Sequence, residues 1–247
     1  MSAASRFALR PRSAHEPAPD LTRIVVTHRA IGQDLDRLVA CLGQTAGGVM
    51  PRPIPAWRYT AAILAQISTH NEGEDDILWP ATAAAAGPAV DITPLADDRL
   101  VVATTLTQAV RATARVRSQP SASCDLYASI RELRDLLEEH LADEEQQVLP
   151  AMRRYLRADA YQWCEKQMQR KATLPVRRFA APWLARHAQS HELHILRAAS
   201  GWPTRLLLAG SGAAFARLER RALSASPAPQ RPPSFPFSSR SGEEERK

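Results

Sequence analysis

Two stretches of the chain carry a histidine four residues before a glutamate. The first, HNEGEDDILWP, has this pair at His70 and Glu74. The second, HLADEEQQVLP, lies seventy residues later and has the pair at His140 and Glu144. Histidine and glutamate at this spacing project from one side of a helix about one turn apart, so both can reach the same metal ion. The repeat therefore predicts that two imidazoles and two carboxylates converge on a metal centre.

Two further residues fall in step with this repeat. His28 precedes His70 by 42 residues, and Asp98 precedes His140 by the same number. Each is followed by an arginine and lies on the apolar stripe of its predicted helix. Two equivalent helix pairs would place His28 and Asp98 at matching positions around a pseudo-twofold axis. The predicted metal ligands are His28, His70, Glu74, Asp98, His140 and Glu144.

The two predicted glutamate ligands lie among leucines and isoleucines rather than on a polar face. An ionised carboxylate in such surroundings is costly unless it is paired or coordinated, so Glu74 and Glu144 need a partner. Asp143 has a spacing that makes it an alternative ligand to Glu144. The acidic neighbours Asp75 and Glu145 point away from the ligand direction, and we expect them to be solvated or to lie behind the ligands.

The elements that must position these residues are helical throughout. Apolar residues recur at steps of three and four in four stretches, which begin near Leu21, Ala56, Thr93 and Asp125. Short segments containing glycine, proline or serine separate these stretches. The predicted fold class is therefore all-α, an antiparallel four-helix bundle over residues 20–156.

The chain outside the bundle divides into three parts. Three less regular helical stretches follow the bundle, at 158–172, 176–199 and 203–224. They predict a basic helical extension over residues 157–224 that packs on the bundle. The leader, residues 1–19, and the tail, residues 225–247, are rich in proline and charge, and both are predicted to be disordered.

Composition excludes several classes of function. The net charge of +6 arises mainly in the extension, and few aromatic residues accompany the arginines, so no nucleic-acid surface is predicted. No uncharged apolar run reaches the length of about eighteen residues that a membrane span needs. Three cysteines without a CxxC spacing favour a reducing cytoplasm. His187, His191 and His194 have the spacing of a second metal site, but we expect an exposed helical face there.

Three stretches of the sequence, THRAIGQDLDRL, HNEGEDDILWP and HLADEEQQVLP, resemble the hemerythrin-like, or HHE cation-binding, domain. That domain has a histidine on its first helix and HxxxE motifs on its second and fourth. The resemblance implies a non-haem di-iron centre inside the bundle. Carried over to this sequence, it implies that His28 and His70 bind one iron and His140 the other, while Glu74 and Glu144 bridge them.

One departure from the family pattern concerns the third helix. The family usually has a histidine there, whereas this chain has no histidine between His70 and His140 and has Asp98 in that register. Aspartate can ligate iron or manganese. Three outcomes therefore stay open: an asymmetric dinuclear site, a mononuclear site, or a degenerate site that binds no metal.

The resemblance also implies a function. Members of the family bind or sense O₂, NO or peroxide, or buffer iron, and some decompose peroxide. We therefore expect a cytoplasmic iron protein that binds or senses one of these small molecules. The alternatives are a peroxide-decomposing or other oxidative di-iron enzyme, which needs the same open coordination position, and a metal-free interaction bundle.

Overall fold

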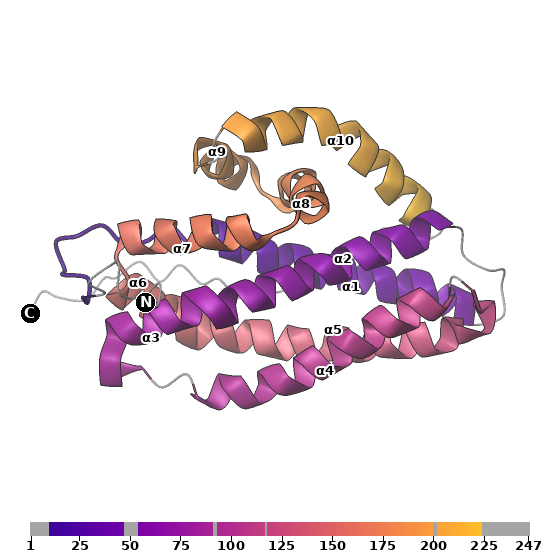
Figure 1. The fold of residues 1–247 in the computed structure, drawn as a ribbon, viewed down its shortest axis with the longest axis horizontal. Coiled ribbons are helices and arrows are strands. Elements are labelled where there is room, and N and C mark those ends of the chain that lie inside the picture. The colour runs from indigo at the N-terminus through magenta and orange to yellow at the C-terminus, as the bar shows by residue number, and fades with distance from the viewer. Residues whose placement is uncertain (1–9, 47–53, 91–92, 117, 200–201, 224–247) are drawn as a thin grey trace, which may run out of the picture.

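The computed structural model of the chain describes residues 10–46, 54–90, 93–116, 118–199 and 202–223, and every regular element within them is helical. Four long helices lie side by side along the long axis of the molecule (Figure 1). They are α1 (Thr22–Ala46), α2 (Ile54–Gly73), α4 (Thr93–Val116) and α5 (Ser123–Asp143). The prediction of an all-α bundle is confirmed. No helix in the described part of the chain has both the length and the apolar character needed to cross a membrane.

Each long helix, together with the short helices that continue it, is one rod of the bundle. The second rod, which contains α2, and the fourth, which contains α5, share a local distortion at their glutamates. In each of these two rods, the long helix continues through a π-helical turn into a short helix. The turns are η2 (Glu74–Leu78) and η5 (Glu144–Val148), and the short helices are α3 (Trp79–Ala86) and α6 (Leu149–Tyr155). A proline is the second residue of each short helix. Because proline lacks an N–H and its ring crowds the carbonyl of the preceding turn, it disfavours a regular α-helical ladder there.

The apolar core consists of two clusters. The larger lies among the four long helices and includes buried residues of α8 (Leu174–His187) and α10 (Trp202–Leu223). The smaller packs α3, α6 and the start of α1 against α7 (Ala158–Lys171). On α1, Ile24 belongs to the smaller cluster and Ile31 to the larger, with His28 between them in the chain. The second rod has the reverse order along the chain, with His70 between Ile67 of the larger cluster and Leu78 of the smaller. The histidines therefore stand where the two apolar clusters meet.

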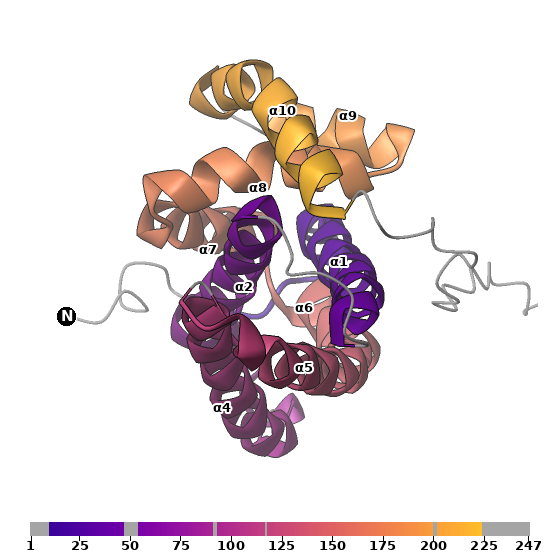
Figure 2. The same cartoon turned by 90° about the vertical axis from the view of Figure 1, so that its right-hand side faces the viewer.

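The C-terminal helices form a layer on one side of the bundle. They are α7, α8 (Leu174–His187), α9 (Ser190–Ala199) and α10 (Trp202–Leu223). Figure 2, which views the molecule along its long axis, shows this layer over α1 and α2, with α4 and α5 on the opposite side. The layer therefore covers the helices that carry His28 and His70.

One predicted helix of this layer is two helices in the structure. The stretch predicted at 176–199 breaks at Ala188, whose backbone is extended (φ −76°, ψ 140°). The new helix, α9, begins with a capping interaction in which the backbone N–H of Gln189 donates to the Glu192 carboxylate at 2.8 Å. This cap gives α9 its own start, which the apolar spacing did not indicate.

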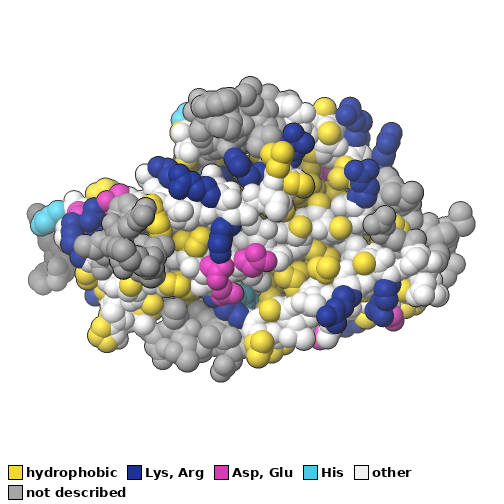
Figure 3. All heavy atoms as spheres, in the orientation of Figure 1, with side chains coloured by type: hydrophobic (Ala, Val, Ile, Leu, Met, Phe, Trp, Pro, Cys, Tyr) yellow, Lys and Arg dark blue, Asp and Glu magenta, His cyan; other side chains and the backbone are white. Residues whose placement is uncertain are grey.

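Ion pairs of both polarities join the layer to the bundle, and the exposed pair between Lys171 and Asp76 has the polarity expected of a basic layer on an acidic bundle. The layer is basic, yet its glutamates make the buried contacts: Glu192 with Arg29 of α1 at 2.6 Å, and Glu219 with Arg37 of α1 at 2.7 Å. On the face in Figure 3, acidic side chains gather near the centre with basic side chains above them. The attraction of a basic segment for an acidic bundle therefore accounts for contacts at the surface but not for these two buried ion pairs.

A buried carboxylate also ties the layer to the bundle. Asp34 of α1 is fully buried, and its Oδ2 accepts hydrogen bonds from the Tyr59 hydroxyl at 2.8 Å and the Trp183 indole N–H at 2.7 Å. Arg37 and His187 approach it at 2.9 and 3.4 Å. Burial alone would raise the pKa of Asp34, but the hydrogen bond with His187 and the charges of His187 and Arg37 outweigh burial and lower that pKa.

The two ends of the chain were predicted to be disordered. The tail, 225–247, and residues 1–9 lie outside the described residues. Residues 10–19 of the leader are described and are attached to the bundle: the backbone N–H of Arg12 donates to the Tyr155 carbonyl at 2.8 Å, and its guanidinium donates to the Arg153 carbonyl at 3.0 Å. These bonds attach a segment in which Pro19 is the one buried residue among residues 10–19.

Candidate metal centre

Four buried side chains from three rods of the bundle converge on one point. They are His28 of α1, His70 of α2, Glu74 of η2 and Glu144 of η5, and one donor atom from each lies within 4.8 Å of the others. Their exposed fractions range from 1 to 8%. The helical spacing predicted by the HxxxE motif is present, because His70 Nε2 lies 3.4 Å from Glu74 Oε1.

The donor atoms of this cluster are poorly satisfied by the protein itself. Nε2 of His28, Nε2 of His70 and Oε2 of Glu144 are buried and have no hydrogen-bond partner among the described residues. Buried polar atoms normally have partners, so their convergence here needs an explanation. Imidazole nitrogens and carboxylate oxygens are ligands for iron, manganese and zinc. The residues present therefore fit a bound metal ion.

His140 is attached to the cluster through Glu144. Its Nε2 lies 3.1 Å from Glu144 Oε1, whereas it is not one of the four residues whose donor atoms converge. Burial alone would raise the pKa of Glu144, but the hydrogen bond with His140 and the charges of the surrounding histidines outweigh it and lower that pKa to about 2. Glu144 is therefore held as a carboxylate.

Glu145 orients His28. Its Oε1 lies 3.0 Å from His28 Nδ1, so Nδ1–H donates to this carboxylate and Nε2 is left to face the cluster. Burial alone would lower the pKa of His28, but the hydrogen bond with Glu145 and the carboxylates of Glu74 and Glu144 raise it to about 10. The sequence analysis expected Glu145 to be solvated or to lie behind the ligands. In the structure it lies behind His28 and accepts its Nδ1–H hydrogen bond.

Asp98 does not face the cluster, contrary to expectation. Its side chain is exposed, and the next residue of α4, Arg99, points toward the cluster instead. Successive residues of an α-helix differ in direction by about 100°. The 42-residue spacing that selected Asp98 counts across an interhelical connection, where helical periodicity does not fix the register. A one-residue error in that count is enough to exchange the two side chains.

Arg99 brings a cation to both glutamates. Its Nη2 lies 3.2 Å from Glu144 Oε1 and 3.8 Å from Glu74 Oε2, and its Nη1 bonds to the Asp75 carboxylate. The guanidinium carbon lies 4.3 Å from the ring centroid of Trp79. Stacking and ion pairs from several directions hold the guanidinium in place. Arg99 therefore stands beside the carboxylates on the α4 side, where the family pattern has a histidine.

The other candidate ligands lie outside the cluster. Asp143 is half-buried and does not join the four converging residues, so the structure favours Glu144 over it. His187 is buried and its Nδ1 lies 2.8 Å from Gln33 Oε1, whereas His191 and His194 are exposed. These three histidines therefore do not form a second metal site.

Comparison with known proteins identifies the family of this chain. The family model described as hemerythrin HHE cation binding domain matches residues 20–152, more than half of the chain. Neither a curated protein nor a solved structure matches the chain. The matched segment contains all four converging residues, and it ends within α6. The chain belongs to the hemerythrin HHE cation-binding domain family.

Proposed function

We propose that the buried cluster binds one iron ion and that the iron-loaded chain binds or senses O₂, NO or peroxide. The observation that carries the proposal is the convergence of His28, His70, Glu74 and Glu144 inside the bundle. Two imidazoles and two carboxylates match the mixed nitrogen and oxygen ligands that non-haem iron uses. When bound, iron would supply the redox and ligand-binding chemistry that none of these side chains has alone.

Each neighbouring residue has a distinct part in this proposal. Glu145 fixes the tautomer of His28, so that its Nε2 is the ligating nitrogen. His140 holds Glu144 through a hydrogen bond and thereby sets the direction of its carboxylate. The apolar residues on either side of the cluster, such as Ile31 and Leu78, limit the access of water. The chain thus supplies ligands that are already oriented in a dry interior.

Arg99 supports the proposal of a single metal ion. The family resemblance implies two irons bridged by Glu74 and Glu144, but the Arg99 guanidinium already contacts both carboxylates. Two unit charges 4 Å apart near a protein surface interact by about 4 kcal/mol, and the repulsion of a dication is larger. Arg99 therefore replaces the second metal ion as the partner of the carboxylates, and the site is mononuclear.

Replacing Arg99 with histidine should raise the iron content of the reconstituted chain from about one ion per chain toward two, because the new imidazole stands with His140 and the carboxylates as a second ligand set. Arg99→Lys is the matched control, since it keeps the cation and should leave the content near one. Metal analysis by mass spectrometry measures both. An Arg99→His variant that still holds one iron would contradict the assignment of Arg99.

The small-molecule part of the proposal has a spectroscopic test. Adding NO or peroxide anaerobically to the iron-loaded chain should change its optical spectrum, with an endpoint at about one equivalent per iron. The His70→Ala variant should show no such change, and the exposed His191→Ala variant should behave as the parent does. An optical spectrum of the iron-loaded chain that does not change on addition of O₂, NO or peroxide would contradict the proposed function. Sustained peroxide turnover that is lost in His70→Ala would instead assign a peroxide-decomposing enzyme.

A further inference from the structure

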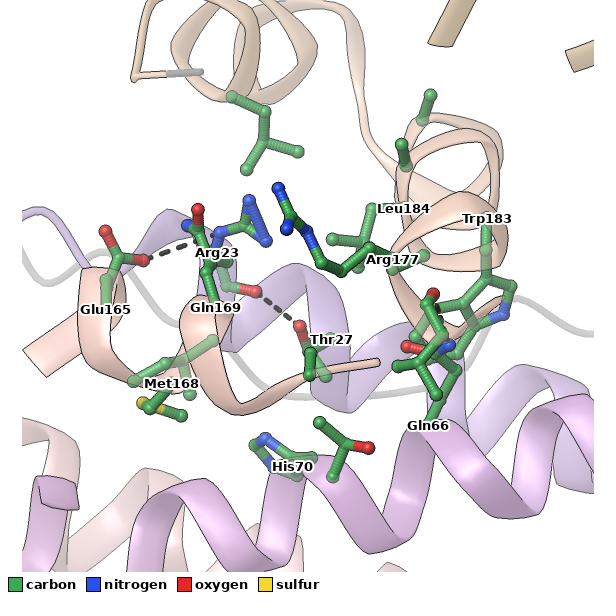
Figure 4. A pocket seen from close by; sticks show the side chains of 18 of the residues that line it. Arg23, Thr27, Gln66, His70, Glu165, Met168, Gln169, Arg177, Trp183 and Leu184 are labelled. Carbon is green, nitrogen blue, oxygen red and sulfur yellow. Dashed lines mark hydrogen bonds and ion pairs between the residues drawn. The ribbon is translucent and has the colours of Figure 1, made fainter. Parts of the chain in front are cut away.

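A pocket lies between the bundle and the C-terminal layer, next to the metal-binding cluster. Its volume is about 160 Å³, and residues of α1, α2, α7, α8 and α9 line it. Figure 4 shows His70 at the bundle side of this pocket, with Met168 and Leu184 on either side. An apolar cavity of about 150 Å³ holds one benzene molecule, so this pocket is large enough for a small organic body.

Positive charge dominates the pocket lining. Three arginines, Arg23, Arg177 and Arg197, face one glutamate, Glu165. Figure 4 shows the side chains of Arg23 and Arg177 extending toward each other across the pocket. Arg23 is held by a single ion pair with Glu165, whose closest atoms are 3.6 Å apart. The lining therefore has an excess of positive charge in mostly apolar surroundings.

Arg177 lines this pocket, and its guanidinium has no partner among the described residues. It is half-buried on α8, and it makes no side-chain hydrogen bond or ion pair with any of the described residues. A guanidinium in partly apolar surroundings gains most from a carboxylate, because the two groups can form two parallel charge-assisted hydrogen bonds. The partner that fits Arg177 is therefore a ligand with a carboxylate group.

We propose that this pocket binds a small carboxylic acid with an apolar body, such as an aromatic or short aliphatic acid. The carboxylate binds between Arg177 and Arg23, and the apolar body packs against Met168 and Leu184 toward His70. The C-terminal layer supplies Arg177, Met168 and Leu184, so this layer builds a second binding site beside the metal-binding imidazole. The inference does not depend on which metal, if any, the cluster binds.

Benzoate is the probe that tests the proposal, because it combines a carboxylate with a benzene-sized body. Isothermal titration calorimetry on the full-length chain should show one saturable site for benzoate. Acetate lacks the apolar body and benzyl alcohol lacks the charge, so each should bind at least about tenfold more weakly. Benzyl alcohol binding as tightly as benzoate, or no saturable benzoate binding, would overturn the proposal.

Two neighbouring arginines of α8 provide a matched pair of variants. Arg177→Gln should weaken benzoate binding by at least about tenfold, because it removes the charged hydrogen-bond donors. Arg178→Gln changes the same charge on an exposed side chain and should alter the affinity by less than about twofold. Equal losses in both variants would show a general charge effect and contradict a site at Arg177.

The same titration separates this pocket from the metal. It is carried out on the iron-loaded chain and on the chain after chelation. Benzoate should bind both forms, because Arg177 and the apolar lining are present in each. Benzoate binding that requires iron would place benzoate on the metal and contradict the proposed pocket site. Benzoate binding without iron would support the pocket site even if the cluster proved unable to hold iron.

Discussion

Replacing His70 with alanine should abolish stoichiometric iron binding. His70 is one of the two imidazoles in the converging set, and its loss leaves His28 and the carboxylates without a second nitrogen donor. We expect the affinity for Fe(II) to fall by at least about a hundredfold, measured anaerobically by competition with a chelator. Glu144→Gln should have a comparable effect, since it removes one anionic donor.

A thermal shift provides a second readout for this variant. A metal that binds the native state at one hundred times its dissociation constant stabilises that state by about 2.7 kcal/mol. The parent chain should therefore melt at a higher temperature with Fe(II), and His70→Ala should not. His191→Ala removes an exposed histidine of α9 and should keep the full shift. Iron affinity and thermal shift unchanged in His70→Ala would refute the ligand assignment.

Replacing Asp34 with alanine should be the most destabilising single change in the interface between the bundle and the layer. It leaves the Tyr59 hydroxyl and the Trp183 indole without their acceptor and removes a buried partner of Arg37. Removing one partner from a buried charged network costs about 3–5 kcal/mol. Urea unfolding of the full-length chain measures this loss directly.

Asp36 is the matched control on the same helix. Its side chain is 58% exposed and forms an ion pair with Arg134 whose closest atoms are 3.1 Å apart. An exposed pair of this kind contributes about 1 kcal/mol or less, so Asp36→Ala should unfold close to the parent. If Asp34→Ala proved no more destabilising than Asp36→Ala, the network around Asp34 would have no special part in attaching the layer.

The pH dependence of stability should change in the Asp34→Ala variant. Because the pKa of Asp34 is lowered in the folded state, its contribution is fully present above the unfolded value of about 4. The contribution is lost as the pH falls through the lower, folded value. The difference in unfolding free energy between the parent and the variant should therefore be largest near neutral pH and shrink in acid. A difference that grows below pH 4 would contradict this account.

The apolar periodicity was sufficient to predict the bundle and the pairing of histidine with glutamate within each motif. The spacing of His70 and Glu74 lies inside one rod, where helical geometry fixes which residues share a face. The prediction failed where it crossed a connection, as for Asp98 and Arg99. The sequence shows Arg99 next to Asp98, but the apolar periodicity does not determine which of these two side chains faces the cluster.

Other features of the structure depend on tertiary contacts that periodicity does not contain. The partner of His28, Glu145, comes from another rod, so only the packing of α1 against η5 reveals it. Asp34 is different, because its position three residues after Ile31 and four before Leu38 places it on the inward face of α1. A buried aspartate was therefore within reach of the sequence, although its partners on α8 were not.

The central claim is that a metal ion explains the buried cluster, and the metal content of the full-length chain tests it most directly. The chain is incubated anaerobically with Fe(II), desalted, and analysed for iron and protein. We predict about one tightly bound iron per chain, because the converging donors otherwise leave buried polar atoms without partners. A content below about 0.2 iron per folded chain would contradict the account.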